Sequence, residues 1–216
     1  MKIRTERYLE DFFKRKAELT YLGAAVRDAV DMVVSAVKHG NKLLACGNGG
    51  SASDCEHICG ELMKSFLLKR KLSEEFRRTL DGIFGAEEGK KLSDGLQQGI
   101  PCIPLVSFSS LMTAFSNDCN SEMVFAQQVN VLGSQGDVLL AISTSGNSSN
   151  VLYAAEIAKA KGMPIIAFTG RDGGRLKSHA DILLNAPADQ VYLIQEYHEP
   201  LYHVICLCIE SEMFES

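Results

Sequence analysis

Residues 136–148 read Gly136-Asp137-Val138-Leu139-Leu140-Ala141-Ile142-Ser143-Thr144-Ser145-Gly146-Asn147-Ser148, an apolar run that ends in a cluster of hydroxyls. The apolar part predicts a buried strand over 137–142, and the periodicity that follows predicts a helix over 149–161. The start of a helix leaves unpaired N–H groups and a partial positive charge, which suit an anion. One Ser or Thr would be enough to cap the helix. Four hydroxyls in residues 143–148 therefore favour a phosphate or sugar site, which we call the phosphate cradle.

Strands and helices alternate along most of the chain. Short apolar runs predict strands at 42–46, 103–107, 137–142, 165–169 and 181–184. Periodic segments predict helices at 53–68, 109–119, 123–132, 149–161, 175–178 and 191–213. This alternation is typical of an α/β protein with a parallel sheet covered on both faces. Ligands of such sheets bind at the carboxyl ends of the strands, where the cradle is expected to lie.

We expect a single domain over residues 1–216. The segments outside the alternating strands and helices are an N-terminal pair of helices and an insertion. Helical spacing over residues 4–39 predicts an N-terminal pair of helices, ended by Gly40. Residues 69–100 are rich in charges and glycines, and the sequence from Ser73 to Phe76 has the form of a helix start. We interpret this segment as an inserted helical excursion, because it is too short to hold its own core. Its charges fit either a solvated surface or a lid over a pocket.

Composition narrows the class of protein. The 216 residues are 46% hydrophobic and 23% charged, as in ordinary soluble domains. A net charge of −5 offers no electrostatic case for binding nucleic acid. No apolar run reaches the ~20 residues that span a bilayer, so no membrane partner is expected. Seven cysteines, an odd number partly in apolar runs, indicate reduced thiols and a cytoplasmic protein.

A second glycine-rich turn follows the first predicted strand. Gly47-x-Gly49-x-x-Ala52 formally fits a dinucleotide fingerprint, but the chain then runs into the charged insertion, with no apolar strand before Ile103. We therefore expect no nucleotide cofactor. The alternatives are a tight turn that needs positive φ, or a turn in which residues 48–51 contact a polar ligand.

Two groups of polar side chains are candidates for acid/base catalysis or metal binding. His57 and Glu61 lie four residues apart and share a helix face, as metal ligands or an acid/base pair would, although a surface pair is the simpler interpretation. The second group opens an otherwise apolar helix and consists of Gln195, Glu196, His198, Glu199 and His203. Spacing pairs His203 with Glu199 or Glu196 and cannot choose between them. Pro200 lies within this group and could kink the helix.

Together, four motifs resemble the sugar isomerase (SIS) domain family: residues 46–51, 142–148, 169–174 and 195–203. The resemblance covers residues 1–68 and 101–216. It implies a flavodoxin-like three-layer sandwich with a five-stranded parallel sheet. It also implies a homotetramer with active sites between subunits.

The resemblance assigns roles residue by residue. Glu61 and His203 match the catalytic acid/base residues. Members that bind zinc, one ion per site, use residues matching His57, Glu61, Gln195 and His203, which selects Gln195 over its acidic neighbours. Substrate contacts match Asn48, Gly49, Gly50, Ser51, Asn117, Asp118, Ser143, Thr144, Ser145, Ser148 and Gln195.

The expected activity is aldose–ketose isomerisation of a phosphorylated sugar through an enediol, with sedoheptulose 7-phosphate converted to D-glycero-D-manno-heptose 7-phosphate. The alternatives are a non-catalytic regulatory tetramer that binds a partner, and another phosphosugar enzyme such as an arabinose 5-phosphate isomerase or a deglycase. Two departures bear on this choice. The insertion at 69–100 is longer than the usual connection, and Pro200 stands between Gln195 and His203.

Overall fold

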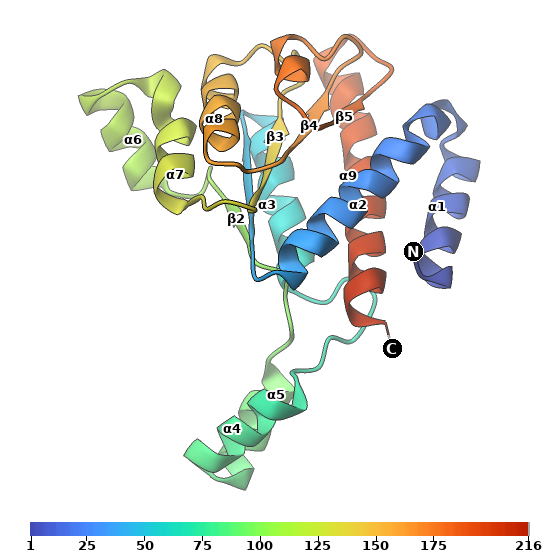
Figure 1. Cartoon of the computed structure of the whole chain (residues 1–216), viewed down its shortest axis with the longest axis vertical. Coiled ribbons are helices and arrows are strands. Elements are labelled where there is room, and N and C mark those ends of the chain that lie inside the picture. The colour runs from blue at the N-terminus through green and yellow to red at the C-terminus, as the bar shows by residue number, and fades with distance from the viewer. Residues whose placement is uncertain (216) are drawn as a thin grey trace.

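The computed structural model describes residues 1–215 and contains one sheet of five parallel strands (Figure 1). The strands are β1 (Leu43–Gly47), β2 (Cys102–Pro104), β3 (Val138–Ile142), β4 (Ile165–Thr169) and β5 (Ile182–Asn185), and their spatial order is β2-β1-β3-β4-β5. This is the order of flavodoxin-like doubly wound folds. The predicted α/β class and five-stranded parallel sheet are therefore confirmed.

Helices cover both faces of the sheet (Figure 1). One face carries α2 (Gly23–Lys38), α3 (Gly50–Met63) and α9 (Val191–Phe214), with α1 (Ile3–Arg15) packed on α9. The other face carries α7 (Val124–Leu132) and α8 (Ser149–Ala160). Further elements are α6 (Ser109–Asp118) and the 3₁₀ turns η1 (Ala17–Leu22), η2 (Ser121–Met123) and η3 (Arg175–Ser178).

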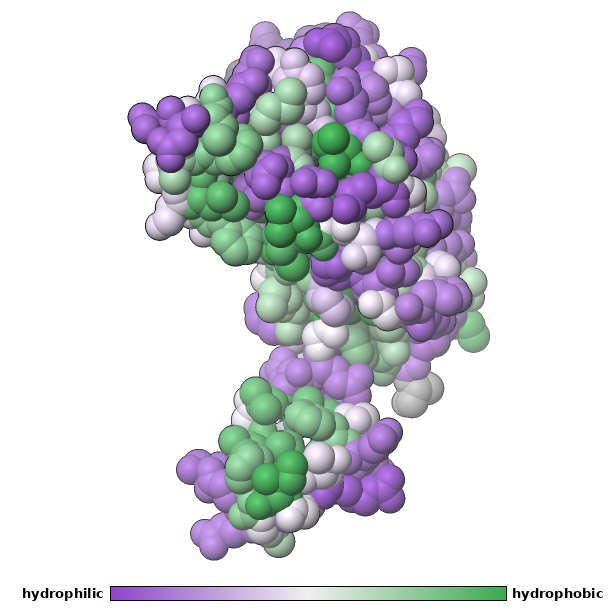
Figure 2. Space-filling view, turned by 60° about the vertical axis from the view of Figure 1, so that its left-hand side comes forward, coloured by the Kyte–Doolittle hydropathy of each residue, from purple (hydrophilic) through white to green (hydrophobic). Residues whose placement is uncertain are grey.

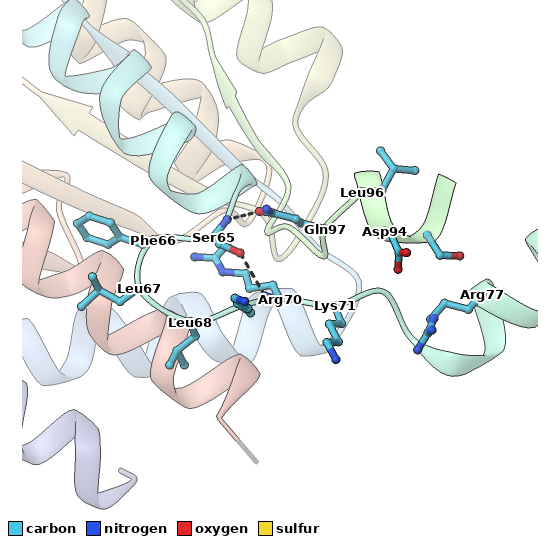
Figure 3. Close-up of a pocket in the computed structure, with 12 residues that line it drawn as sticks. Ser65, Phe66, Leu67, Leu68, Arg70, Lys71, Arg77, Asp94, Leu96 and Gln97 are labelled. Atoms are coloured by element: carbon cyan, nitrogen blue, oxygen red, sulfur yellow. Dashed lines mark hydrogen bonds between the residues drawn. The ribbon is translucent and has the colours of Figure 1, made fainter. Parts of the chain in front are cut away.

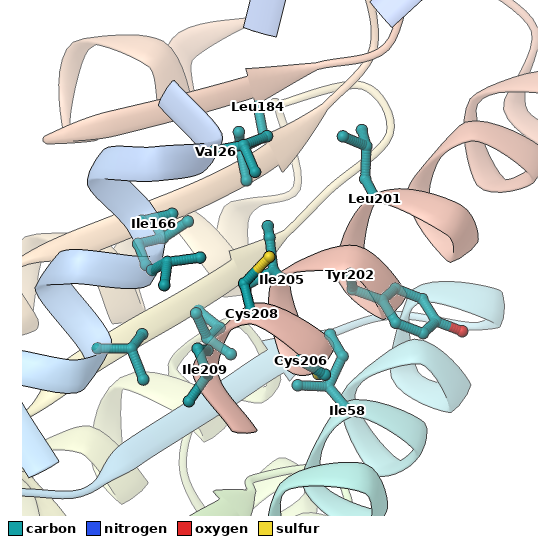
Figure 4. Close-up of a cluster of buried hydrophobic side chains, with 14 of the residues drawn as sticks. Val26, Ile58, Ile166, Leu184, Leu201, Tyr202, Ile205, Cys206, Cys208 and Ile209 are labelled. Atoms are coloured by element: carbon teal, nitrogen blue, oxygen red, sulfur yellow. The ribbon is translucent and has the colours of Figure 1, made fainter. Parts of the chain in front are cut away.

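Alternate side chains along the strands point into two separate hydrophobic cores, one on each face of the sheet. Leu43 and Ala45 of β1 pack among α2, α3 and α9, whereas Leu44 and Cys46 pack among α7 and α8. All of β1, β3 and β4 is buried, as expected for central parallel strands. Figure 4 shows the first core, where apolar side chains of α2, α3, β4 and α9 meet. The ring of Tyr202 belongs to this core, and its hydroxyl points away from it (Figure 4).

Helix α3 is shorter than its periodicity predicts. It ends at Met63 rather than near residue 68, and Lys64 is already extended. The backbone N–H groups of Phe66, Leu67 and Leu68 donate to the carboxylate of Glu210 on α9 instead of to helix carbonyls. A partner more than 140 residues away therefore ends the helix.

The insertion forms a hairpin of two helices, α4 (Glu74–Phe84) and α5 (Ala86–Gly95). The predicted helix start is confirmed, because the Ser73 hydroxyl accepts from the N–H of Phe76. The hairpin projects from the end of the molecule opposite the carboxyl ends of the strands, so it does not cover the phosphate cradle (Figure 1). Figure 2 shows apolar surface on the hairpin, where Ile83 and Phe84 are more than half exposed.

The remaining expectations from composition concern thiols and membranes. The seven cysteines are free, and all but Cys119 are buried. Among residues 1–215, no helix combines the length and the apolar character that crossing a bilayer requires.

Candidate active site

The phosphate cradle (residues 143–148) links the carboxyl end of β3 to the start of α8. The Ser143 and Ser148 hydroxyls are 3.1 Å apart, and the N–H of Gly146 donates to the carbonyl of Ser143. Ser148 occupies the N-cap position, yet its side chain does not bond to the backbone of α8. The hydroxyls therefore do not serve as caps, and the first N–H groups of α8 stay available to an anion.

The glycine-rich segment after β4 hydrogen-bonds to the backbone of the cradle. The N–H of Gly170 donates to the Thr144 carbonyl, and the N–H of Leu176 donates to the Gly146 carbonyl. Gly146 has a φ of +64°, and a Cβ added there would lie 2.1 Å from the carbonyl oxygen of Gly173. Only glycine lets these two turns approach so closely.

The start of α3 lies beside the start of α8. The side-chain amides of Asn48 and Asn150 exchange two hydrogen bonds of 2.9 Å. The amide of Gln195 lies directly over Gly50, where a Cβ would come within 2.3 Å of its Nε2 atom. The turn of residues 47–50 thus brings Asn48, Gly50 and Gln195 to the edge of the sheet that carries the cradle. Ser51 follows and is buried.

His57 is the centre of the second part of the site. Its Nε2 atom lies 3.4 Å from Nε2 of His203 on α9 and 3.5 Å from Oε1 of Glu61. Its Nδ1 atom is 2.9 Å from the hydroxyl of Tyr202. The structure therefore brings together three of the residues singled out from the sequence. His57 and Glu61 lie two to three turns along α3, about 10 Å or more from Gly50.

The electrostatics of this cluster suit proton transfer. Burial lowers the pKa of His203 and the neighbouring His57 lowers it further, so the ring is neutral at neutral pH. The Glu61 side chain is only 13% exposed, and the ammonium of Lys64 lies 2.8 Å from its Oε2 atom. A neutral imidazole and a fixed carboxylate therefore face the same space.

Three further residues belong to this cluster, and the sequence reasoning did not assign them a role. They are Asp54, Lys64 and Tyr202. Burial, and next the charge of Glu199, raise the pKa of Asp54 to about 6, and its Oδ2 atom has no hydrogen-bond partner in the described part of the chain. Helical spacing from His57 could have identified Asp54, three residues earlier on α3.

The donor set fits a metal ion. A tetrahedral zinc with bonds of 2.0–2.1 Å separates neighbouring ligand atoms by about 3.4 Å. The contacts of His57 with His203 and Glu61 match this spacing. The carboxylate of Glu199 also comes within 4.8 Å of both imidazoles, which makes it an alternative ligand. If the Nδ1–H of His57 donates to Tyr202, its Nε2 lone pair is free to bind the ion.

Asn117 and Asp118 stand apart from these groups. They lie at the end of α6, bond to each other at 2.8 Å and are exposed. Within residues 1–215, no hydrogen bond joins them to the cradle. Pro200 lies inside α9, which continues through it from Val191 to Phe214, so the helix carries both Gln195 and His203.

His198 differs from the other histidines. It is fully buried, and its Nε2–H donates to the carbonyl of Thr169 at 3.0 Å. Burial lowers its pKa to about 4 despite that bond. A neutral histidine at the end of β4 holds α9 against the sheet, and we assign it to the fold rather than to the site.

We expect His198 to make stability depend on pH. Its folded pKa lies below the ordinary value of 6.5, so the unfolded chain binds the proton more readily and stability falls as pH drops from about 6.5 towards 4. At about 1.4 kcal/mol per pH unit, the loss approaches about 3 kcal/mol. Urea unfolding of wild type and His198→Gln between pH 7.5 and 4.5 measures it. Equal pH slopes for the two proteins would contradict this role.

The fold and the site define a class of protein: a doubly wound α/β protein with a hydroxyl-rich turn at the carboxyl end of β3 and a histidine–carboxylate cluster between two helices. Comparison with known families matches the SIS domain over residues 7–93 and 98–170. The chain therefore belongs to the SIS domain family. The match runs to residue 93 and takes in most of the insertion, which the resemblance of motifs leaves out.

Relatives that are named phosphoheptose isomerase agree with this assignment. The phosphoheptose isomerase of Helicobacter pylori strain P12 is 38% identical over 195 residues, which are 90% of this chain and 88% of that protein. The structure of phosphoheptose isomerase from Neisseria gonorrhoeae has a TM-score of 0.73 and 33% identity, and covers 96% of this chain and 97% of its own. For the enzyme from Francisella tularensis, the TM-score is 0.72, the identity 30%, and the coverage 98% and 100%.

Proposed function

We propose that this chain is an aldose–ketose isomerase that converts sedoheptulose 7-phosphate to D-glycero-D-manno-heptose 7-phosphate. The approach of His57 to both Glu61 and His203 is the observation that carries the proposal, because it places a carboxylate and an imidazole in one cluster. The names of the relatives support the choice of sugar. Its relatives of 30–38% identity that are named phosphoheptose isomerase make the chain an enzyme of sugar-phosphate isomerisation.

The phosphate of the sugar binds in the cradle. The hydroxyls of residues 143–148 and the uncapped start of α8 offer donors to its oxygens. Asn48 and Gln195 lie along the same sheet edge and can donate to sugar hydroxyls. Binding energy gained at the phosphate then holds the reacting carbons in place.

Glu61 and His203 transfer the protons. Isomerisation moves one proton between C1 and C2 and another between their oxygens, through an enediol. A carboxylate held by Lys64 can take the carbon-bound proton, and a neutral His203 can exchange the oxygen-bound proton. The opposite assignment uses the same atoms. A hollow of about 390 Å³ between α1, Phe66 and α9 opens beside His203 and gives access to it.

We further propose one zinc ion per site, held by His57, Glu61 and His203, with Glu199 completing the set. The expected ligand Gln195 has its amide over Gly50, about two turns of α3 from His57. Bound zinc would polarise the sugar carbonyl as a Lewis acid. Metal analysis of the purified chain tests this assignment. We expect about one zinc per chain, lost in His57→Ala, and a metal-free but fully active protein would contradict it.

The reaction itself is tested with sedoheptulose 7-phosphate in heavy water. We expect the aldose to form and deuterium to enter at the reacting carbons. A panel of phosphosugars of different length, including arabinose 5-phosphate, determines the specificity. Absence of exchange with every sugar would contradict the isomerase and favour a regulatory SIS protein.

The assembly is proposed to be a homotetramer with sites between subunits. Helix α6 has no buried residue, and Phe108, Leu111 and Val131 expose apolar side chains. The side chain of His57 is 41% exposed, as expected for a site that a second subunit would cover. Light scattering of the purified chain measures the mass, and a monomer would contradict the proposal.

A further inference from the structure

A buried ion pair, Arg70 with Glu210, lies outside the proposed active site. Arg70 donates from Nε to Oε1 of Glu210 at 2.7 Å, and the two side chains are 0% and 1% exposed. Burying two charges costs several kcal/mol per ion, and apolar replacements of such pairs are often neutral or stabilising. Stability alone is therefore a poor explanation for this pair, and its contacts indicate a geometric role.

Glu210 accepts hydrogen bonds from the backbone of the loop that follows α3. Besides Arg70, its carboxylate accepts from the N–H groups of Phe66, Leu67 and Leu68 at 2.7, 2.8 and 3.0 Å. Burial on its own would raise the pKa of Glu210, but these donors hold that pKa below its ordinary value. The carboxylate is therefore ionised and fully bonded in the fold.

Arg70 closes the other side of the contact. Its Nη1 donates to the carbonyl of Leu62 at 2.6 Å, and its Nη2 donates to the carbonyl of Glu61 at 3.2 Å. These are among the last carbonyls of α3, which lack partners within the helix. The guanidinium also stacks 4.8 Å from the ring centre of Phe214 on α9. Arg70 thus donates a hydrogen bond directly to the backbone of Glu61, the proposed catalytic residue.

We propose that Arg70 and Glu210 are positioning residues whose pair fixes Glu61 on α3 relative to His203 on α9. Glu210 lies seven residues after His203, two turns along the same helix. The pair therefore joins the two helices about 10 Å from the point where their side chains meet. This inference rests on the proposed isomerase function and assigns a role to residues that contact no substrate.

The insertion begins and ends at this clamp (Arg70 with Glu210). The N–H of Ser65 donates to Oε1 of Gln97 at 2.8 Å, and the N–H of Gln98 donates to the carbonyl of Arg70 at 2.8 Å. Figure 3 shows Ser65, Arg70 and Gln97 together at the base of the hairpin, beside a cavity of about 390 Å³. The clamp thus separates the projecting hairpin from the end of α3.

Two conservative variants test the clamp: Arg70→Lys keeps both buried charges, whereas Glu210→Gln leaves the Arg70 guanidinium without its counter-charge. Arg70→Lys keeps a cation for Glu210 but cannot also reach two carbonyls of α3. Glu210→Gln keeps an acceptor for the loop. We expect kcat to fall about tenfold or more in both, because small displacements of catalytic groups are costly. KM should stay within about twofold, since the cradle is on other elements.

Lys42→Met is the matched control. Lys42 contacts the buried carboxylate of Asp137 at 2.6 Å, at the amino ends of β1 and β3 and away from the site. Its loss should lower Tm and leave kcat unchanged when all proteins are measured well below their Tm. Wild-type kcat in both clamp variants, or an equal loss of kcat in the control, would overturn the proposal.

Hydrogen exchange separates this proposal from the proposed function. In both clamp variants, peptides covering residues 62–70 and 199–206 should exchange faster than in wild type, and a peptide covering 143–152 should not change. Unchanged exchange in the first two peptides would overturn the clamp. Inactive wild-type protein would instead refute the isomerase, and the exchange result would still decide whether the pair holds the two helices together.

Discussion

Replacing Glu61 by Gln is expected to lower kcat for isomerisation by a factor of about 10² to 10⁴, the usual contribution of a general acid/base. The change removes the carboxylate but keeps the shape of the side chain, which is 13% exposed. At 1.36 kcal/mol per tenfold, the activation barrier rises by about 3 to 5 kcal/mol. KM should change little, because the proposed phosphate cradle lies between β3 and α8, away from the element that carries Glu61.

Turnover of sedoheptulose 7-phosphate and deuterium uptake from heavy water measure this effect together. Both should fall in parallel, since both need the same proton removal. Glu156→Gln is the control: Glu156 is on α8, is about half exposed, and its carboxylate makes one weak ion pair within residues 1–215, to His179 at 3.9 Å. Activity near wild type in Glu61→Gln would remove Glu61 from the mechanism.

Replacing Gly146 by Ala is expected to disrupt the other end of the site. The new Cβ would lie 2.1 Å from the carbonyl oxygen of Gly173 and 2.9 Å from the N atom of Gly174, so the backbone of the cradle must move. The φ of +64° adds about 1–2 kcal/mol of strain for a residue with a side chain. We expect KM to rise tenfold or more, with a smaller effect on kcat.

Gly40→Ala separates strain from loss of the cradle. Gly40 also has a positive φ, +82°, but a Cβ there meets nothing within 4 Å, and the residue lies in the turn after α2. Both variants should lose stability, measured as Tm, and only Gly146→Ala should lose affinity for the sugar phosphate or for inorganic phosphate. An unchanged KM in Gly146→Ala would show that the cradle does not bind the phosphate.

Most elements of the fold follow from local pattern. The apolar run of β4 occupies residues 165–169, as its composition predicts, and the start of α4 at Ser73 follows from its capping sequence. Helix α3 ends at Met63, five residues before the end that its periodicity predicts. Helical periodicity continues past Met63, and only the distant carboxylate of Glu210 draws the next N–H groups out of the helix.

The residues of the candidate site also fall into two groups: those adjacent in the sequence and those that only the fold brings together. The cradle is a run of consecutive residues, so its hydroxyls, its strand and its helix could be read together from the sequence. The pairing of His57 with His203 joins positions 146 residues apart, and spacing along α9 left its partner undecided. Nothing in the local sequence around Tyr202 shows that its hydroxyl meets His57.

By itself, the sequence determined the alternation of strands and helices, the cradle and the family. These depend on side chains close together in the chain, whose periodicity and capping act locally. Only the tertiary structure decided where α3 ends, that the hairpin points away from the cradle, and that Arg70 and Glu210 join the two helices of the proposed site. Each of these depends on contacts between distant segments, and their geometry exists only once both sheet faces are packed.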